Sequence, residues 1–145
     1  MTNTTIANTG VKAATIFRTN TKQGNVSLVV KNCTFYNLFS GEALMRDIIG
    51  GTNSFTAENI LFAGSGSVKI FNKTSDAPGI INGSKIYSSS DLTVANAGEV
   101  STTALSYSSS QLFPNASSST DVLDLTFGAD IPNEVKIIGD PRWNK

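Results

Sequence analysis

The chain has 145 residues, of which 11 are basic and 11 acidic, so its formal net charge is zero, and it contains no histidine. This length predicts one domain with a buried core, and the absence of a basic run excludes the electrostatic signature of a nucleic-acid-binding protein. Without histidine, and with one cysteine, the chain cannot form a histidine-based catalytic triad, an intrachain disulfide or a thiolate metal cluster.

Residues 1–10 have neither the basic start nor the apolar segment of a signal peptide, and no later apolar run is long enough to cross a bilayer. If the protein is secreted, its export signal is expected upstream of this fragment. The order Asn3, Thr5, Ile6 recurs as Asn32, Thr34, Phe35, so the chain begins within a repeat. We therefore expect either a longer protein of which this is the C-terminal portion, or an open end that pairs with another copy.

Short segments rich in Val, Ile, Phe and Thr follow along the chain, separated by Gly, Asn and Ser. This pattern predicts strands, because apolar residues seldom recur at helical spacing. The segments are NVSLVV (25–30), SFTAENILF (54–62), SVKIF (67–71), SKIY (84–87), DLTV (91–94) and VLDLTF (122–127).

The strand segments repeat along the chain at a constant sequence spacing of 27. The pairs at this spacing are Leu28–Phe55, Val30–Ala57, Asn32–Asn59, Cys33–Ile60 and Phe35–Phe62. A second apolar series, Phe17, Leu44 and Phe71, has the same spacing. A third coil follows at a spacing of 25, which places Tyr87 after Phe62 in the first series.

A repeat of strands and turns predicts an all-β protein, a right-handed parallel β-helix with a coil period of about 27 residues and a C-terminal cap. Neighbouring coils then lie about 4.8 Å apart, so residues one period apart touch. The predicted core columns are Phe35–Phe62–Tyr87, Phe17–Leu44–Phe71 and Cys33–Ile60. Asn32 and Asn59 are predicted to form a ladder at a corner, since Asn tolerates a left-handed backbone.

The division of the chain follows from where this repeat weakens. Residues 1–90 are predicted to form β-helix coils, and residues 91–145 a Ser-rich irregular coil and the C-terminal cap of the same domain. Two further strands are expected near 123–127 and 135–138. We expect them, with Trp143, to cover the C-terminal end of the core.

The sequence resembles the C-terminal β-helix region of pectate-lyase-like proteins secreted by Gram-negative gut bacteria, a group of domains of unknown function. The likeness is carried by Asn32-Cys33-Thr34-Phe35-Tyr36, its degenerate copy Asn59-Ile60-Leu61-Phe62, and the terminal Gly139-Asp140-Pro141-Arg142-Trp143. It implies an extracellular or cell-surface protein associated with polysaccharide use. It supplies no catalytic residues, and the calcium-binding acids and catalytic base of true pectate lyases have no counterpart that can be placed on this chain.

Arg46 and Lys73 are the first candidate ligand-binding residues, because a spacing of 27 places two like charges side by side. Either both side chains extend into water, or an anion such as a uronate carboxylate offsets their repulsion. The acids face bases instead, since Glu58 aligns with Lys31 and Glu42 with Lys69. Such exposed ion pairs contribute little, so no catalytic residue, metal site or cofactor is predicted.

Tyr36 is the third candidate, because it should point outward beside the inward Phe35, and Tyr107 lies in the Ser-rich stretch. Exposed rings stack on sugars, although both rings could equally pack under neighbouring segments. The leading prediction is a non-catalytic, carbohydrate-associated β-helix module that binds acidic polysaccharide. The alternatives are the C-terminal part of a polysaccharide lyase or hydrolase with its active site on upstream coils, and a structural module that self-associates through open coil ends.

Overall fold

The computed structural model describes residues 1–7, 15–18, 25–38, 43–46, 50–71, 77–95, 100–116 and 123–145. Most of the regular structure in these ranges is strand, and the helices are single turns. The strands are β1 (Thr2–Ala7), β2 (Thr15–Arg18), β3 (Ser27–Tyr36), β4 (Ala43–Arg46), β5 (Gly50–Ala63), β6 (Gly66–Phe71), β7 (Pro78–Ser88), β8 (Leu92–Ala95) and β9 (Thr103–Ala104). The helices are α1 (Ser109–Leu112), α2 (Asn133–Lys136) and the 3-10 turn η2 (Pro141–Trp143).

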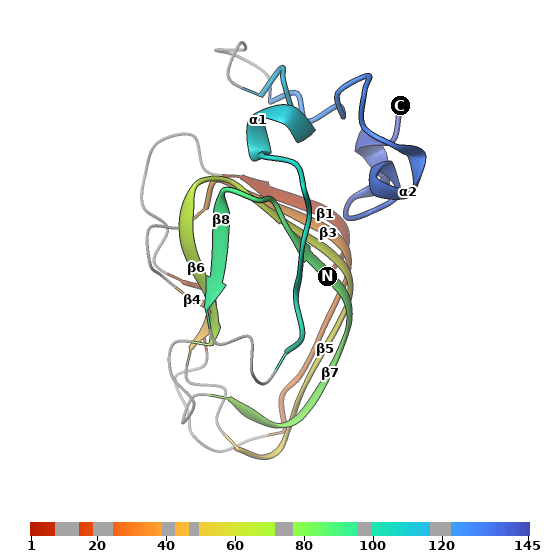
Figure 1. Ribbon diagram of the computed structural model, residues 1–145. Coiled ribbons are helices and arrows are strands. Elements are labelled where there is room, and N and C mark those ends of the chain that lie inside the picture. Colours follow the sequence, from red (N-terminus) through yellow and green to blue (C-terminus); the bar gives the residue numbers. More distant parts are fainter. Residues whose placement is uncertain are drawn as a thin grey trace.

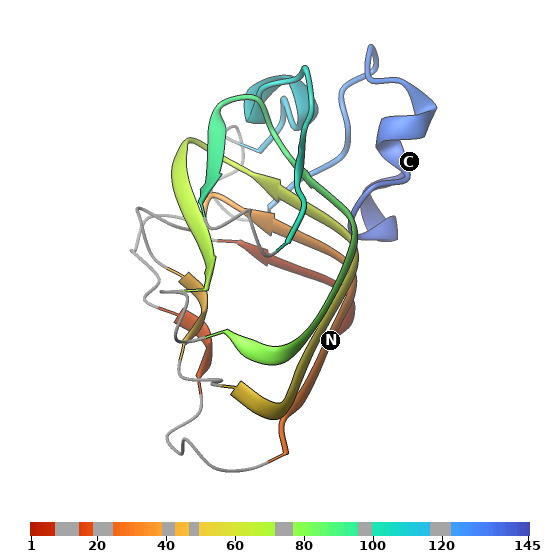
Figure 2. The same ribbon diagram turned by 60° about the horizontal axis from the view of Figure 1, so that its bottom comes forward.

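Successive strands alternate between two parallel sheets, ordered β1-β3-β5-β7-β9 and β2-β4-β6-β8. Figures 1 and 2 show the two sheets as facing walls, with the chain passing from one to the other. The protein is therefore all-β with mostly parallel sheets, as the sequence predicts. Parallel strands need crossover connections, and here the other sheet supplies them in place of helices.

The register between β3 and β5 confirms the predicted spacing of 27. Phe35 lies beside Phe62, and their rings stack with centroids 5.1 Å apart and planes inclined by 18°. The predicted alignment of β1 with β3 is also confirmed, since Ile6 lies beside Phe35. Five of the six predicted strand segments lie in β3, β5, β6, β7 and β8.

The predicted spacing of 25 for the third coil is wrong by one residue. Strand β7 follows β5 at a spacing of 26, so Phe62 lies beside Ser88 and Leu61 beside Tyr87. Because side chains alternate between the two faces of a strand, a slip of one residue reverses every one of them. Tyr87 consequently leaves the predicted Phe35–Phe62 column and joins an apolar cluster on the outer face of the sheet.

The predicted column Phe17–Leu44–Phe71 is also corrected. Phe17 lies beside Met45, and Met45 beside Phe71. Phe17 and Met45 are 28 residues apart, and Met45 and Phe71 are 26 apart. The sum equals two periods of 27, so the column still begins at Phe17 and ends at Phe71, as predicted. Leu44 is nonetheless buried in the core.

The predicted asparagine corner is confirmed and extends further than expected. Asn3, Asn32 and Asn59 have φ of 49°, 50° and 55°, in the left-handed region that Asn tolerates. Asn59 Nδ2 donates to Asn32 Oδ1 at 3.0 Å, and Asn32 Nδ2 donates to Asn3 Oδ1 at 3.1 Å. Lys85, at the corresponding place in β7, continues the corner with a φ of 53°.

The first sheet is buried on both faces near the carboxyl end of β5. Ile60 and Phe62 enter the core between the two sheets, whereas Leu61 and Ala63 belong to a second cluster on the outer face. The other buried members of this outer cluster come from the C-terminal third of the chain: Leu112, Phe113, Leu125, Phe127, Ile131, Val135 and Ile138. Parallel strands covered on both faces read as continuous apolar runs, as in the segment 60–63.

The expectations for the C-terminal segment are largely wrong. Residues 123–127 form no regular strand, and α2 occupies much of the stretch expected as a second strand. Pro132 is the N-cap of α2, with Glu134 in the first turn and Lys136 in the last, which favours a helical turn. Figure 1 shows α1 and α2 outside the two walls, beside β1 and β3.

Trp143 does not cover the C-terminal end of the core, because it reaches the first strand, where its Nε1 donates to Thr5 Oγ1 at 2.6 Å. At the C-terminal end it is Val100 that is buried in the core. A Cβ added at Gly83 of β7 would lie 2.8 Å from Val100 Cγ1, so Val100 packs directly on the β7 backbone. Strand β8 extends the second sheet past residue 90, whereas the short strand β9 extends the first.

Candidate functional site

The predicted cationic pair is only partly described by the structure. Arg46 lies at the end of β4 and is half-buried, whereas Lys73 lies outside the described residues. The strands on this side of β4 pair at a spacing of 26, because Met45 lies beside Phe71. The Arg46–Lys73 pair itself stays a prediction.

Arg46 does have a cationic neighbour, which the spacing of 27 missed. Arg18 of β2 lies directly beside Arg46 in the parallel pair β2–β4, and its side chain is exposed. Like charges on adjacent strands repel each other. A bound carboxylate or other anion is one way to offset that repulsion, since guanidinium groups bind carboxylates through two parallel hydrogen bonds.

Tyr36 points away from the core but is covered. Its ring meets the ring of Phe113 edge-on, with centroids 5.8 Å apart, and it is half-buried in the outer cluster together with Tyr107. Burial raises the pKa of the Tyr36 phenol, and the charge of Asp91 raises it further. The interpretation that both rings pack against a neighbouring segment is therefore confirmed.

The carboxylates of Glu58 and Asp91 are held by different partners. Glu58 forms the predicted ion pair with Lys31 at 2.7 Å, and a hydrogen bond and the charge of Lys31 lower the pKa of this exposed acid. Asp91 accepts from the backbone N and the hydroxyl of Ser109 at 2.9 and 2.6 Å. Within the described residues, no three His, Cys, Asp or Glu side chains are grouped so that they could hold a metal ion.

The most highly organised polar site of the described structure was not anticipated from the sequence. Asp140 is fully buried, and its carboxylate accepts from the Thr5 hydroxyl at 2.7 Å and from Arg142 Nε at 2.9 and 3.0 Å. Arg142 Nη2 also contacts this carboxylate. Desolvation by burial raises the pKa of Asp140, but the hydrogen bonds from Arg142 and Thr5 outweigh it and leave the pKa below its usual value.

The backbone beside this buried carboxylate joins the terminal motif to both copies of the coil motif that carry the sequence resemblance. Asp140 N donates to Thr34 Oγ1 at 3.0 Å, and Gly139 N donates to Asn59 Oδ1 at 3.3 Å. Gly139 has a φ of 81°, and a Cβ there would lie 2.4 Å from Thr34 Oγ1. The terminal motif 139–143 is thus a clasp on the asparagine corner. The sequence feature that could have indicated this contact is the presence of the coil motif and the terminal motif in the same chain.

Cys33 carries no accessible thiol. It is fully buried beside Ile60, as predicted, and its Sγ lies 3.0 Å from the carbonyl oxygen of Lys31. Desolvation by burial raises its pKa, so the nucleophilic thiolate form is disfavoured at neutral pH. The residue serves packing in this structure.

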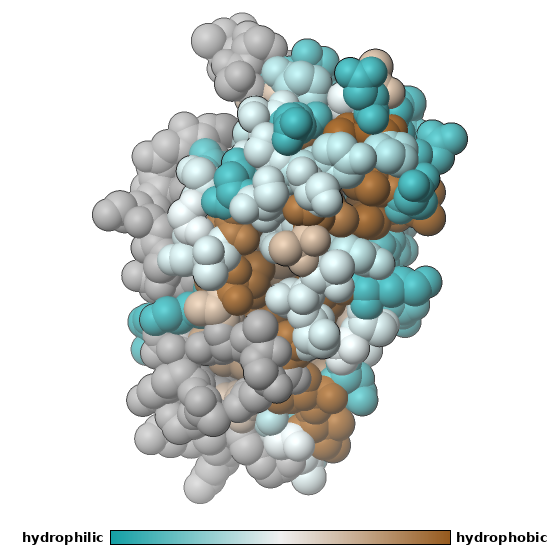
Figure 3. Space-filling model, in the orientation of Figure 1, coloured by the Kyte–Doolittle hydropathy of each residue, from teal (hydrophilic) through white to brown (hydrophobic). Residues whose placement is uncertain are grey.

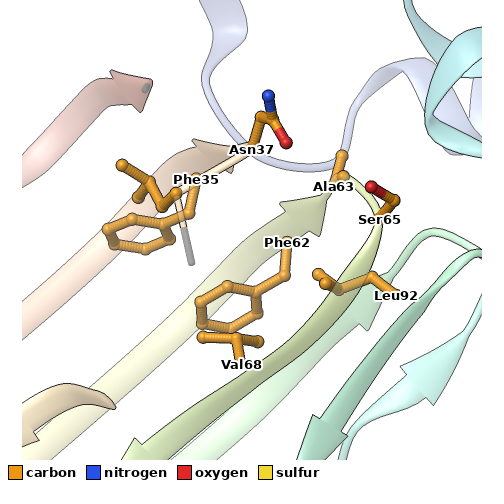
Figure 4. Close-up of a pocket in the computed structure, with 9 residues that line it drawn as sticks. Phe35, Asn37, Phe62, Ala63, Ser65, Val68 and Leu92 are labelled. Carbon is orange, nitrogen blue, oxygen red and sulfur yellow. The ribbon is translucent and has the colours of Figure 1, made fainter. Parts of the chain in front are cut away.

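The described cavities are too small for an organic ligand. One lies between the two sheets beside the stacked rings of Phe35 and Phe62, with Val68 and Leu92 close by, and has a volume of about 10 Å³ (Figure 4). A second, of the same volume, lies within the core among Val30 and its neighbours. Such a volume holds about one water molecule. Neither of these two cavities has room for a polymer or another extended ligand.

Comparisons of the chain with protein-family models, with curated proteins and with solved structures find no match. The resemblance to pectate-lyase-like proteins therefore stays an expectation. None of the helices in the described ranges is long and apolar enough to span a membrane.

Proposed function

We propose that the chain is a right-handed parallel β-helix and acts as a non-catalytic, carbohydrate-binding module. The strand arrangement supports the β-helix. Successive strands alternate between two parallel sheets, and each strand pairs with the equivalent strand of the next coil. Crossover connections between parallel strands are right-handed in about 98% of cases, which supports a right-handed β-helix. In this proposal the module is extracellular or at the cell surface, as the resemblance implies.

The observation that carries the binding proposal is the side-by-side position of Arg18 and Arg46. Parallel strands are about 4.8 Å apart, so two arginine side chains on neighbouring strands can both reach one extended ligand. An acidic polysaccharide supplies repeated carboxylates on one chain, and each could form a paired hydrogen bond with a guanidinium. The proposed ligand is therefore a uronate-containing polymer, bound at the second sheet.

The test compares the binding of polygalacturonate with that of a neutral glucan, using the wild-type chain and the double variant Arg18→Gln, Arg46→Gln. We expect the wild-type chain to bind polygalacturonate but not the neutral glucan, and this binding to weaken as salt rises. In the double variant, the affinity for polygalacturonate should fall at least tenfold. The matched control is Lys31→Gln, which removes an exposed cation from the first sheet. Equal binding by wild type and double variant, or binding by neither, rejects the proposal.

A further inference from the structure

The two faces of the first sheet belong to separate apolar clusters. Among the described residues, the cluster between the two sheets has no member beyond Val100. The cluster on the outer face takes most of its buried members from residues 112–138, and its buried members from the sheet are Leu61 and Ala63 of β5. We call residues 105–116 and 123–143 the strap. Because no described member of the inner cluster lies in the strap, the strap can leave the outer face without opening the core between the sheets.

The two runs of the strap are packed on each other. Gly128 N donates to Leu112 O at 2.9 Å, and the rings of Phe113 and Phe127 have centroids 4.9 Å apart. A Cβ added at Gly128 would lie 2.8 Å from Gln111 O, so the two backbones approach each other closely. These contacts do not depend on the sheets, and they favour movement of the strap as one body.

One end of the strap is fastened to β7 and to the turn that follows it. Leu105 N donates to Ser88 O at 2.8 Å. The backbone N and the hydroxyl of Ser109 donate to the carboxylate of Asp91 at 2.9 and 2.6 Å. This end therefore depends on the last coils of the stack.

The other end is fastened to three successive strands of the same sheet. Gly139 N donates to Asn59 of β5, Asp140 N donates to Thr34 of β3, and the Asp140 carboxylate accepts from Thr5 of β1. In a stack of coils each strand contacts its neighbours alone. The strap nevertheless connects β7 with β1, which are separated in the sheet by β3 and β5.

We propose that the strap opens and closes over the outer face of the first sheet as one body while the sheets stay paired, so that loosening either end loosens the other. The open state uncovers Tyr36, Leu61, Ala63 and Tyr87, which the strap covers when closed. Figure 3 shows the closed state, with small apolar areas between polar ones on the visible face. The inference is independent of the proposed arginine site, which lies in the second sheet.

Two variants loosen the strap at opposite ends. Thr34→Val keeps the shape of the side chain but removes the acceptor of Asp140 N. Ser109→Ala removes the hydroxyl bond to Asp91. The matched control is Thr56→Val, which makes the same change as the first variant on the outer face of β5, at a half-buried residue with no contact to the strap within the described structure.

Native-state hydrogen exchange of the full chain then reports on the end that each variant does not touch. We expect Thr34→Val to speed exchange of the Leu105 and Gly128 amides about fivefold, the equilibrium effect of one typical hydrogen bond. Ser109→Ala should speed exchange of the Gly139 amide by a similar factor, because both variants favour the same opening. The hydrogen-bonded amides of β5 should keep their protection, and Thr56→Val should change the strap amides by less than about twofold.

The proposal is overturned if Thr34→Val speeds exchange at Gly139 and its neighbours alone, or if Thr56→Val has the same effect as Thr34→Val. Wild-type exchange provides a test without any substitution, should a variant fail to fold. The amides of Leu105, Gly128 and Gly139 should then show protection factors that agree within about threefold and lie below those of β5. Protection that differs more widely among the three amides, or equals that of β5, also overturns the proposal.

Discussion

The hydroxyl of Thr5 donates to Asp140 Oδ2 at 2.7 Å, joining residues that are 135 positions apart in the chain. The same hydroxyl oxygen accepts from Trp143 Nε1 at 2.6 Å. One side chain of the first strand thus holds both a buried carboxylate and the single tryptophan of the protein. The C-terminal segment is consequently fastened to the start of the stack, along its outer face.

Replacing Thr5 with valine should destabilise the protein and loosen this segment. The change keeps the shape of the side chain but leaves a buried carboxylate and an indole N–H each short of a partner, and the loss of a hydrogen bond to a charged group costs about 1.5–3 kcal/mol. Urea denaturation followed by the fluorescence of Trp143 measures the loss. Thr4→Val is the control, because the Thr4 hydroxyl bonds to the backbone of its own strand. Equal losses in the two variants would contradict the role of Thr5.

Acid should weaken the clasp through Asp140. Its pKa in the folded protein is below the usual value of about 3.9. A carboxyl group of this kind stabilises the folded state fully above its unfolded pKa, and the stabilisation is lost as the pH falls below about 4 and through the folded pKa. The variant Asp140→Asn should therefore be less stable than wild type at neutral pH, and the difference should shrink in acid. If the difference in unfolding free energy between wild type and Asp140→Asn stays constant from neutral pH to pH 2, the charge of Asp140 does not contribute to stability.

Gly139→Ala should be destabilising by two separable effects. The φ of 81° disfavours any residue with a Cβ, at about 1–3 kcal/mol, and the new Cβ would also lie 2.4 Å from Thr34 Oγ1. Gly66→Ala is the matched comparison, because Gly66 has a φ of 96° but no heavy atom within 4 Å of the added Cβ. We expect the larger loss of unfolding free energy at Gly139. Similar losses at both positions would mean that the close approach to Thr34 adds nothing.

The central asparagine of the corner allows conformation and hydrogen bonding to be distinguished. Asn32→Gly removes both ladder hydrogen bonds but accepts the φ of 50°, whereas Asn32→Ala removes them and also opposes this backbone conformation. We expect Ala to be less stable than Gly by roughly 1–2 kcal/mol. Thermal or urea denaturation of both variants measures the difference. Greater stability of the alanine variant would show that the left-handed backbone is not retained.

The sequence alone determined the features that depend on local repetition. The spacing of 27 between β3 and β5, the pairing of Phe35 with Phe62, and the Asn32–Asn59 corner were all predictable. Each rests on a run of matched residue types, and in stacked parallel strands like residues one period apart meet. The Lys31–Glu58 ion pair followed from the same register.

Where the spacing between successive strands of a sheet varies, the sequence does not reveal the register. The register is then known only from the strand pairing in the structure. A spacing of 26 in place of 25 moved Tyr87 from the core to the outer cluster, and spacings of 28 and 26 placed Met45 in the column expected for Leu44. A single-residue change is invisible in composition, because Ile, Leu and Met are similar in hydrophobicity. It reverses the face of every side chain that follows in the strand.

The tertiary structure also decided where the C-terminal segment binds and which candidate residues it covers. The sequence predicted that Trp143 packs on the core, but the residue that it contacts, Thr5, belongs to a strand far away in the chain. Tyr36 is covered for this reason, and Arg46 acquires its neighbour Arg18 through pairing of β2 with β4. Contacts such as Thr5–Asp140 leave no periodic trace in the sequence, because they join one turn of chain to one corner of a stack.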